Sequence, residues 1–247
     1  MELTVISSGS RSNCYVIHNE NEALIIEAGA KLIEVKKVLN FDISKIVGCV
    51  ISHEHLDHAK YVAEYLEASI PVRMSEGTNH ALRKMYKKRF ALLCEHGRQF
   101  NAGNFTILPF EVQHDANQPL GFLIKHPDTG KILFLTDTYF SDYVFSGLNH
   151  ILVEANYSDH ILQENIQAGK VHPSMKNRLL GSHMSLATTK ELLSANDLSK
   201  VVNIILIHLS DGNSNARQFK EEITTHTGKP VFIADTGLTV PFYKEGF

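Results

Sequence analysis

Short apolar runs rich in β-branched residues recur along the chain of 247 residues, and they constrain its fold more than any other feature. Runs of this length and composition are typical of buried strands. We expect strands at Leu3–Ile6, Cys14–Ile17, Ala23–Ile26, Ile46–Ile51, Phe105–Leu108, Gly121–Ile124, Ile132–Leu135, Ile151–Val153, Val201–Ile207 and Val231–Ile233. Helical spacing predicts helices at Leu32–Leu39, Ala59–Leu66, Thr78–Leu93, Leu186–Asn196 and Ala216–Thr225. Early hairpins followed by strands that alternate with helices predict a mixed α/β class.

One arrangement of these elements occurs twice. A strand, a polar turn, a second strand and a carboxylate follow one another from Tyr15 to Glu27 and again from Phe122 to Asp137. This repetition predicts two similar halves that face each other. No segment rich in Pro, Gly or Ser divides the chain, so we expect one domain over residues 1–247.

Composition narrows the classes of protein that fit. With 43% hydrophobic residues the chain is not a disordered one, and 24 basic against 27 acidic residues give a net charge of −3. The chain has no overall positive charge that would attract nucleic acid, so a polyanion would have to bind a local basic patch.

Three cysteines without a CxxC pair argue against a disulfide framework. The amino terminus lacks a basic region, and no apolar run approaches the roughly 18 residues of a membrane span. We therefore expect a cytoplasmic protein with no membrane association, and the sequence leaves its oligomeric state open.

Fourteen histidines are an unusual excess, and three of them gather in one short segment. The segment His53-Glu54-His55-Leu56-Asp57-His58 follows a predicted buried strand and precedes a predicted helix. In such a turn, residues two apart can project to one side, while Asp57 and His58 leave from the first helical turn. Imidazole and carboxylate groups are common ligands of divalent cations, so this loop can serve two adjacent ions.

Two ions need more ligands than one loop supplies, and further candidates follow other predicted strands. His114 follows Phe110-Glu111-Val112-Gln113, Asp137 ends Leu133–Thr136, and His208 ends the long apolar run from Val201. Strand ends of an α/β sheet are where ligands usually bind. Asp137 is the natural bridge, because a carboxylate has two oxygens and can hold ions about 3.5–4 Å apart.

These residues, in this order along the chain, resemble the metallo-β-lactamase superfamily. The resemblance covers nearly the whole chain and implies an αβ/βα four-layer sandwich, with two mixed sheets flanked by helices and a two-metal site at their open edge. It implies that His53, His55 and His114 bind one ion. It also implies that Asp57, His58 and His208 bind the other, with Asp137 between the two and Glu27 in a supporting position behind them.

A narrower resemblance rests on four short strings. These strings are similar to the WalJ-type branch of exonucleases, whose relatives include phosphodiesterases. They are residues 8–14, His114-Asp115-Ala116, Glu154-Ala155-Asn156-Tyr157, and His208-Leu209-Ser210 with the asparagines after it. The likeness implies that His183 contacts phosphate or acts as a general acid. It also implies substrate-side roles for Asn156, Ser210, Asn213 and Asn215.

Three positions depart from the family pattern. The carboxylate of the first hairpin is Glu27 where the superfamily usually has Asp, which is one methylene shorter. Tyr139 replaces the usual Gly after Asp137-Thr138. The larger side chain predicts a narrower substrate pocket or a different loop covering it. The branch's Gly-His-Leu-Ser-Asn string reads Ser182-His183-Met184-Ser185-Leu186 here. The missing asparagine weakens the exonuclease assignment more than the hydrolase assignment.

The ligand set predicts hydrolysis. Two cations that share a carboxylate lower the pKa of a bridging water, so that a nucleophile forms at neutral pH, and Asp57 can also accept a proton. Nitrogen and oxygen ligands without thiolate suit zinc, manganese or iron, with zinc as the default.

The basic residues favour a phosphorylated substrate. One group lies in a predicted helix (Arg83, Lys84, Lys87, Lys88 and Arg89), and a looser group precedes His183 (Lys170, His172, Lys176 and Arg178). Together with the resemblance to the exonuclease branch, these residues predict a phosphodiesterase or nuclease that acts on DNA or RNA ends or on small phosphodiesters.

Two alternatives remain. A thioesterase or lactonase on the same metal core predicts a dry apolar pocket instead of a basic rim. A protein that keeps the fold but has lost its chemistry is disfavoured by the intact ligand set.

Overall fold

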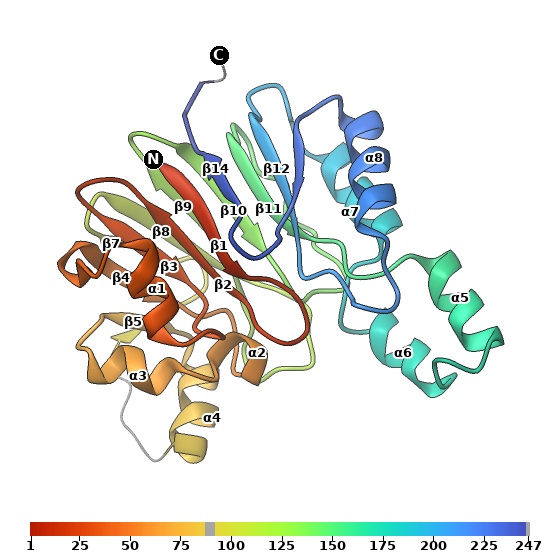
Figure 1. Ribbon diagram of the computed structural model, residues 1–247, viewed down its shortest axis with the longest axis horizontal. Helices are drawn as coiled ribbons and strands as arrows, with labels where there is room; N and C mark the ends of the chain where they lie inside the picture. The colour runs from red at the N-terminus through yellow and green to blue at the C-terminus, as the bar shows by residue number, and fades with distance from the viewer. Residues whose placement is uncertain (87–91, 246–247) are drawn as a thin grey trace.

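Two β-sheets face each other at the centre of the protein, and helices cover their outer faces (Figure 1). The computed structural model describes residues 1–86 and 92–245. The helices α1 to α4 lie beside the first sheet, and α7 and α8 lie beside the second. The order helix, sheet, sheet, helix is the predicted four-layer αβ/βα sandwich.

The first sheet is built mainly from the amino-terminal half of the chain. Its spatial order is β14 (Thr239–Pro241), β1 (Glu2–Ser7), β2 (Cys14–His18), β3 (Ala23–Ile26), β4 (Ile46–Val50), β5 (Val72–Met74) and β6 (Leu92–Leu93). The second sheet has the order β7 (Phe100–Ala102), β8 (Phe105–Glu111), β9 (Leu120–His126), β10 (Gly130–Leu135), β11 (His150–Glu154), β12 (Asn203–Ile207) and β13 (Val231–Ile233).

The two sheets have the same pattern of strand directions. From β14 to β3 the neighbouring strands are antiparallel, and from β3 to β6 they are parallel. From β7 to β10 the neighbours are antiparallel, and from β10 to β13 they are parallel. The hairpins β2–β3 and β9–β10 therefore occupy equivalent places. The predicted repetition of strand, turn, strand and carboxylate is confirmed in the arrangement of the sheets.

Eight α-helices are present among the described residues. They are α1 (Leu32–Val38), α2 (Leu56–Ala59), α3 (Val62–Glu67), α4 (Glu76–Tyr86), α5 (Asp159–Gln167), α6 (Ser174–Leu180), α7 (Leu186–Ala195) and α8 (Ala216–Thr227). A 3-10 turn, η1 (Ile43–Lys45), precedes β4. Helices α5 and α6 project from the body at the lower right of Figure 1.

Alternation along the strands divides the apolar side chains among three layers of core. In β2, Tyr15 and Ile17 pack between the two sheets, while Cys14 and Val16 pack under the helices that flank the first sheet. A third cluster lies between the second sheet and helices α7 and α8, and it includes Phe219. Central strands are thus buried on both faces, which explains why they read as continuous apolar runs.

The sequence predicted some elements imperfectly. All ten expected strands are present, but β5, β6, β7 and β14 were missed because they are only two or three residues long. The expected helix Ala59–Leu66 is two short helices, and Leu92–Leu93, expected at the end of a helix, are in a strand. Helices α5 and α6 were also missed, because Leu162 is their only buried residue.

The three cysteines are buried and free, as expected of small apolar core residues. No helix among residues 1–86 and 92–245 is long and apolar enough to cross a bilayer.

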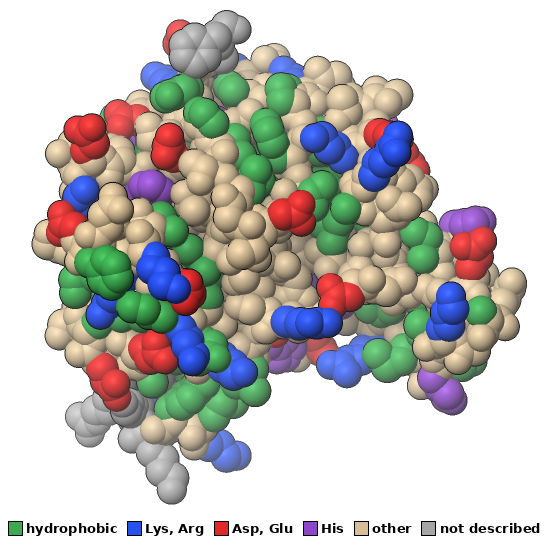
Figure 2. Space-filling view, viewed as in Figure 1, with side chains coloured by type: hydrophobic (Ala, Val, Ile, Leu, Met, Phe, Trp, Pro, Cys, Tyr) green, Lys and Arg blue, Asp and Glu red, His purple; other side chains and the backbone are tan. Residues whose placement is uncertain are grey.

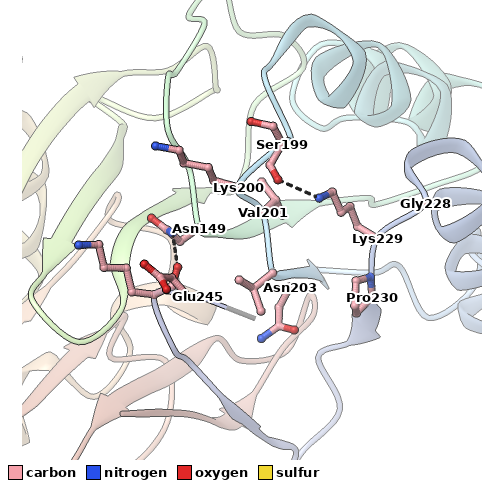
Figure 3. Close-up of a pocket in the computed structure, with 11 residues that line it drawn as sticks. Asn149, Ser199, Lys200, Val201, Asn203, Gly228, Lys229, Pro230 and Glu245 are labelled. Carbon is pink, nitrogen blue, oxygen red and sulfur yellow. Dashed lines mark hydrogen bonds between the residues drawn. The ribbon is translucent and has the colours of Figure 1, made fainter. Parts of the chain in front are cut away.

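A cavity lies at the end of the second sheet where its parallel strands begin. Its volume is about 690 Å³, and Asn149, Val202 and Pro230, which line it, each directly precede one of the strands β11, β12 and β13 (Figure 3). The histidines and carboxylates singled out in the sequence follow the carboxyl ends of strands, so they lie at the opposite end of the strands from this cavity.

Candidate metal centre

The His53–His58 segment forms the predicted turn between β4 and a helix. His53 and His55 lie in the loop, and α2 begins immediately after His55. The backbone N–H groups of His58 and Ala59 both donate to the carbonyl oxygen of His55 (2.9 Å each), which closes the first helical turn. Asp57 and His58 are therefore in the first turn, as the sequence predicted.

The residues directly before β2 and after β3 fix this segment from behind. Asn13 N–H donates to the Asp57 carbonyl oxygen (2.7 Å), and Ala28 N–H donates to the His58 carbonyl oxygen (2.7 Å). The approach is so close that a Cβ on Gly29 would lie 1.8 Å from the Asp57 oxygen. Only glycine fits at position 29, and the backbone of the His53–His58 loop is held in one place.

The second sheet brings the other candidates to the same edge. His114 follows β8, Asp137 follows β10 and His208 follows β12. Asp137 and His208 adopt left-handed backbone angles, with φ of 46° and 53°. Such angles are uncommon for residues other than glycine and often occur at functional sites, where they aim a side chain in a particular direction.

The seven expected ligands converge in two groups that share Asp137. One group holds His53, His55, His114 and Asp137, and the other holds Asp57, His58, Asp137 and His208. In each group one ligand atom per residue lies within 4.8 Å of the others.

The distances identify one carboxylate oxygen as the meeting point. Asp137 Oδ2 lies 3.4 Å from His53 Nε2, 3.5 Å from His114 Nε2 and 3.2 Å from His58 Nε2. Asp57 Oδ2 lies 3.0 Å from His58 Nε2 and 3.1 Å from His208 Nε2. The carboxylate of Asp137 thus stands between the two groups of imidazoles.

The chemistry of this cluster fits divalent cations. His53 Nε2 and His58 Nδ1 are buried and have no hydrogen-bond partner, which is costly for a polar nitrogen. His55 Nδ1 and His114 Nε2 lie 3.1 Å apart, so their lone pairs face each other unless a proton or a cation lies between them. A cation among the ligands would satisfy His53 Nε2, His55 Nδ1 and His114 Nε2, whereas His58 Nδ1 faces the Glu27 carboxylate instead. Imidazole nitrogen with carboxylate oxygen suits zinc, manganese or iron.

Neighbouring groups orient the imidazoles. His53 Nδ1 is hydrogen-bonded to Ser52 Oγ (2.8 Å), and His114 Nδ1 donates to the Ser182 carbonyl oxygen (2.8 Å). In both rings Nε2 is left to face Asp137. Partners of this kind fix the tautomer and direction of histidine ligands in metalloproteins.

The buried charges shift one another's pKa values. Burial alone would raise the pKa of Asp137, but the imidazoles of His208 and His58 hold it well below its usual range. Burial lowers the pKa of His53 well below its ordinary value, and neighbouring His58 lowers it further. Burial also disfavours the charged form of His208, yet Asp137 and Asp57 outweigh it and raise its pKa to about 10.

Glu27 occupies the position in the first hairpin that Asp137 occupies in the second. Its side chain is fully buried, and its φ of 67° is also left-handed. The carboxylate accepts the Ser52 backbone N–H, and Oε1 lies 3.5 Å from His58 Nδ1. Burial raises the pKa of Glu27, and the contact with His58 offsets this only in part. Its place is behind His58, outside the two groups.

One buried carboxylate joins the cluster without having been expected as a site residue. Glu154, the last residue of β11, accepts from His183 Nδ1 (2.6 Å) and lies 3.1 Å from His208 Nδ1, both through Oε1. Its Oε2 accepts the backbone N–H groups of Thr138 and Met184 (3.3 Å each). The signal available in the sequence was a carboxylate at the end of a buried apolar strand, the same signal that marked Asp137.

His183 lies beside both groups. Its ring is 5.4 Å from the ring of His208, nearly parallel to it, and 5.4 Å from the ring of His114. Burial lowers the pKa of His183, but the Glu154 carboxylate outweighs burial and raises this pKa above its ordinary value. With Nδ1 engaged by Glu154, Nε2 is the nitrogen left to meet a substrate.

The expected substrate-side residues lie around the His208 loop. Asn156 Nδ2 donates to the His208 carbonyl oxygen (2.9 Å), while its Oδ1 is buried and has no partner. Ser210 N–H donates to the Asn156 carbonyl oxygen, and Ser210 Oγ accepts the Asn213 N–H. Asn215 caps α8 by accepting the Gln218 N–H (3.1 Å). These contacts shape the loop, and a direct role toward substrate stays a prediction.

Of the two basic stretches, the second lies close to the cluster. Lys87, Lys88 and Arg89 fall outside the described residues, while Arg83 and Lys84 are exposed on α4. Arg178, on α6, lies 4.0 Å from Asp115, the residue next to His114. In Figure 2 the molecular surface is hollowed at its lower margin, and histidines are visible there between the body and the part that carries α5 and α6.

Comparisons with known proteins agree with this geometry. Residues 8–140 match the family model of the metallo-beta-lactamase superfamily. The exodeoxyribonuclease YycJ of Bacillus anthracis is 26% identical over 263 residues, which cover 98% of this chain and 97% of that protein. The metallo-beta-lactamase fold protein YhfI of Bacillus subtilis is similar in structure, with a TM-score of 0.71, 15% identity and coverage of 97% and 99% of the two chains. A diphosphatase of the PhnP family has a TM-score of 0.64 at 16% identity, with coverage of 98% and 97%.

Proposed function

The chain belongs to the metallo-β-lactamase superfamily, and from this premise we propose that, as a metal-dependent hydrolase, it cleaves phosphodiesters at the ends of DNA or RNA or in small molecules. The observation that carries the proposal is the placement of His183. A buried carboxylate holds this imidazole against the cluster of ligands, where a protonated ring suits an anionic substrate. The relationship to an exodeoxyribonuclease along the whole chain supports the same substrate class.

We propose that the two groups each bind one divalent cation. His53, His55 and His114 would bind the first, Asp57, His58 and His208 would bind the second, and Asp137 would lie between them. Zinc is the first candidate, with manganese and iron to be tested beside it. When bound, such cations supply Lewis acidity and activate water at neutral pH.

The chain's own residues would divide the remaining tasks. His183 in its protonated form would contact a phosphate oxygen and deliver a proton from Nε2 to the leaving oxygen. Glu154 would keep that ring in place and favour its protonated form. Asp57, held by Asn13 Nδ2 (3.1 Å) and His208, would orient the ligands and accept a proton. Asn156, Ser210, Asn213 and Asn215 would shape the substrate side, with Glu27 supporting His58.

A carbonyl hydrolase, a thioesterase or lactonase, is the second candidate, because the same ligands can polarise a carbonyl group. The feature that favours it is a cavity beside the site whose lining includes Val144, Met184 and Leu192. The two candidates differ in the charge of the substrate that His183 meets.

The test compares substrates on one preparation. Purified protein is loaded separately with zinc, manganese and iron, and is given bis(p-nitrophenyl) phosphate, end-labelled single- and double-stranded DNA, RNA, and a panel of thioesters and lactones. We expect turnover of the diester and the nucleic acids, and loss of that turnover in His183→Asn. Turnover of a thioester or lactone alone would contradict the proposal.

A matched pair of variants tests the basic residues near the site. Arg178→Glu should weaken cleavage of long nucleic acid more than cleavage of a small diester, because a distant phosphate contact is lost only in the longer substrate. Lys229→Glu, at the opposite edge of the second sheet, serves as the control and should change neither.

A further inference from the structure

A second, smaller cavity lies next to the candidate metal centre, between α7 and the segment that follows Asp137. Its volume is about 270 Å³. The residues that line it are Phe140, Ser141, Asp142, Tyr143, Val144, Met184, Thr188, Glu191, Leu192 and Ala195. A cavity of this size holds one small ring system but not a drug-sized ligand, for which pockets start at about 300 Å³.

Both walls of this cavity are attached to the carboxylate that holds His183. Glu154 Oε2 accepts the N–H of Met184, which lines the cavity, and the N–H of Thr138. Thr138 Oγ1 in turn donates to the carbonyl oxygen of Phe140 (2.6 Å). The lining residue Met184 therefore directly follows His183 in the sequence, and the lining residue Phe140 is three residues after Asp137.

The wall that follows Asp137 is held in shape by aromatic packing. The Tyr143 ring lies edge-on to Phe110, with centroids 5.3 Å apart, and Phe110 is 5.0 Å from Phe145. The N–H of Phe145 donates to Asn196 Oδ1 (2.7 Å), which ties the segment to the end of α7. The exposed rings of Tyr139 and Phe140 stand at the end of this segment nearest Asp137.

The lining selects the kind of group that can enter. Two aromatic rings and four aliphatic side chains offer flat apolar surfaces, while Asp142 and Glu191 are acceptors and Ser141 and Thr188 carry hydroxyl groups. No Lys or Arg lines the cavity, so a phosphate group would meet only negative charge. Asp142 and Glu191 are exposed acceptors at the margin of these apolar surfaces, so a planar ring with hydrogen-bond donors at its edge can use both features, whereas an alkyl chain would use only the apolar surfaces.

We propose that this cavity binds the nucleobase adjacent to the phosphodiester that is cleaved, so that the substrate is a nucleic-acid end whose terminal base is unstacked. This inference rests on the proposed function and adds to it the recognition of a base. Phe140 and Tyr143 would stack on the base, and the acceptors would bind its edge. The Tyr139 ring, where the family usually has glycine, would extend the stacking surface toward the metal centre.

The first experiment compares an oligonucleotide that has a normal terminal nucleotide with one that has an abasic terminal nucleotide. Stacking on aromatic side chains and edge contacts should favour the normal end by roughly tenfold in kcat/KM. Ala195→Leu, which narrows the cavity, and Phe140→Ala should reduce this preference to about twofold or less. Ala187→Leu, an exposed substitution on the same helix outside the cavity, is the control and should retain the full preference.

The second experiment measures binding without turnover. The 5′- and 3′-monophosphates of 2-aminopurine deoxyriboside, which contain no diester, are titrated with the metal-loaded protein, and the fluorescence of the base is followed. Stacking quenches this fluorescence, so quenching is expected with the wild type and Ala187→Leu. It is expected to be much weaker with Ala195→Leu and Phe140→Ala.

The outcomes separate the two proposals. Equal cleavage of normal and abasic ends by the wild type, or equal quenching by all variants, would overturn the base-binding cavity and leave the phosphodiesterase assignment intact. Failure to cleave any diester with any metal would overturn both. If Ala195→Leu instead selectively impairs long-chain thioesters, the cavity is an acyl site and the inference is wrong.

Discussion

Glu27 and Asp137 occupy equivalent positions in the two halves of the molecule and have different surroundings. Each follows the second strand of an antiparallel hairpin, each is buried, and each has a left-handed backbone. Asp137 lies among His53, His58, His114 and His208. The Glu27 carboxylate instead accepts the Ser52 N–H and lies 3.5 Å from His58 Nδ1.

The surroundings of Glu27 and Asp137 differ because the two sheets direct different side chains toward the site. The first sheet directs its His53–His58 loop away from Glu27 and toward the second sheet, so its own carboxylate is left behind the imidazoles. As a result the pKa of Glu27 is raised by burial, while the pKa of Asp137 is lowered by its histidine neighbours. The same backbone position therefore gives a supporting group in one half and a central group in the other.

The largest effect is expected from removing the charge at the central position. Asp137→Asn should lower kcat by about 10³-fold, because it replaces with a neutral amide the carboxylate that would contact both of the proposed cations, and such contacts contribute several kcal/mol. Bound metal, measured by elemental analysis, should fall with it. Glu27→Gln is the matched control, with the same chemical change at the equivalent position, and it should keep its metal under saturating conditions. Equal losses in the two variants would remove the distinction between them.

The next effect concerns Glu154, the second carboxylate of the same sheet edge. Glu154→Gln should lower kcat by about 10²-fold, the scale of a general acid, while KM changes little. Because Glu154 raises the pKa of His183, its loss should also move the alkaline limb of the pH profile to lower pH. A double-mutant cycle with His183→Asn provides the check. Additive effects would show that Glu154 does not act through His183.

These positions also show how far the sequence could predict the site. His53, His55, Asp57 and His58 were found because they lie in one short segment after an apolar run. His114, Asp137 and His208 were found because each follows a predicted strand and the first segment made a metal site plausible. Their convergence depends on contacts between residues far apart in the chain, and only the structure gives these.

The sequence marked Glu154 only as a carboxylate at the end of an apolar strand, and its contacts and the cavity beside it were not predicted for a physical reason. The partners of Glu154, His183 and His208, are 29 and 54 residues away, and no local pattern marks a hydrogen bond across that separation. The fold was predicted better, because burial on both faces of the central strands produces long apolar runs. The elements that were missed, such as α6 and β6, bury little and leave no such trace.

A smaller difference is expected in metal affinity and thermal stability. Glu27→Gln should weaken metal binding about 10- to 100-fold, as is usual when a group that orients a ligand is lost. Chelation should lower the Tm of the wild type by roughly 5–10 °C, because ligand at a hundred times its Kd adds about 3 kcal/mol to a protein of this size. The metal-free Asp137→Asn protein should show almost no change on chelation. A Tm that is insensitive to chelator in all three proteins would contradict the metal assignment.

The smallest effect is in the pH dependence of stability of the metal-free protein, where the two carboxylates should act in opposite directions. The folded pKa of Glu27 lies above its ordinary value, so between the two values the folded state keeps a proton that the unfolded state has lost, and stability falls as pH rises. The folded pKa of Asp137 lies below its ordinary value, so the stability that its charged form contributes is present above the ordinary pKa and is lost as pH falls.

Urea unfolding with chelator at several pH values between 3 and 8 measures these contributions. It should show that Glu27→Gln removes a loss of stability toward neutral pH. Asp137→Asn should remove a loss toward acid pH. Slopes that change in the same direction in both variants would mean that the two buried carboxylates experience similar fields, and the contrast between the halves would not hold.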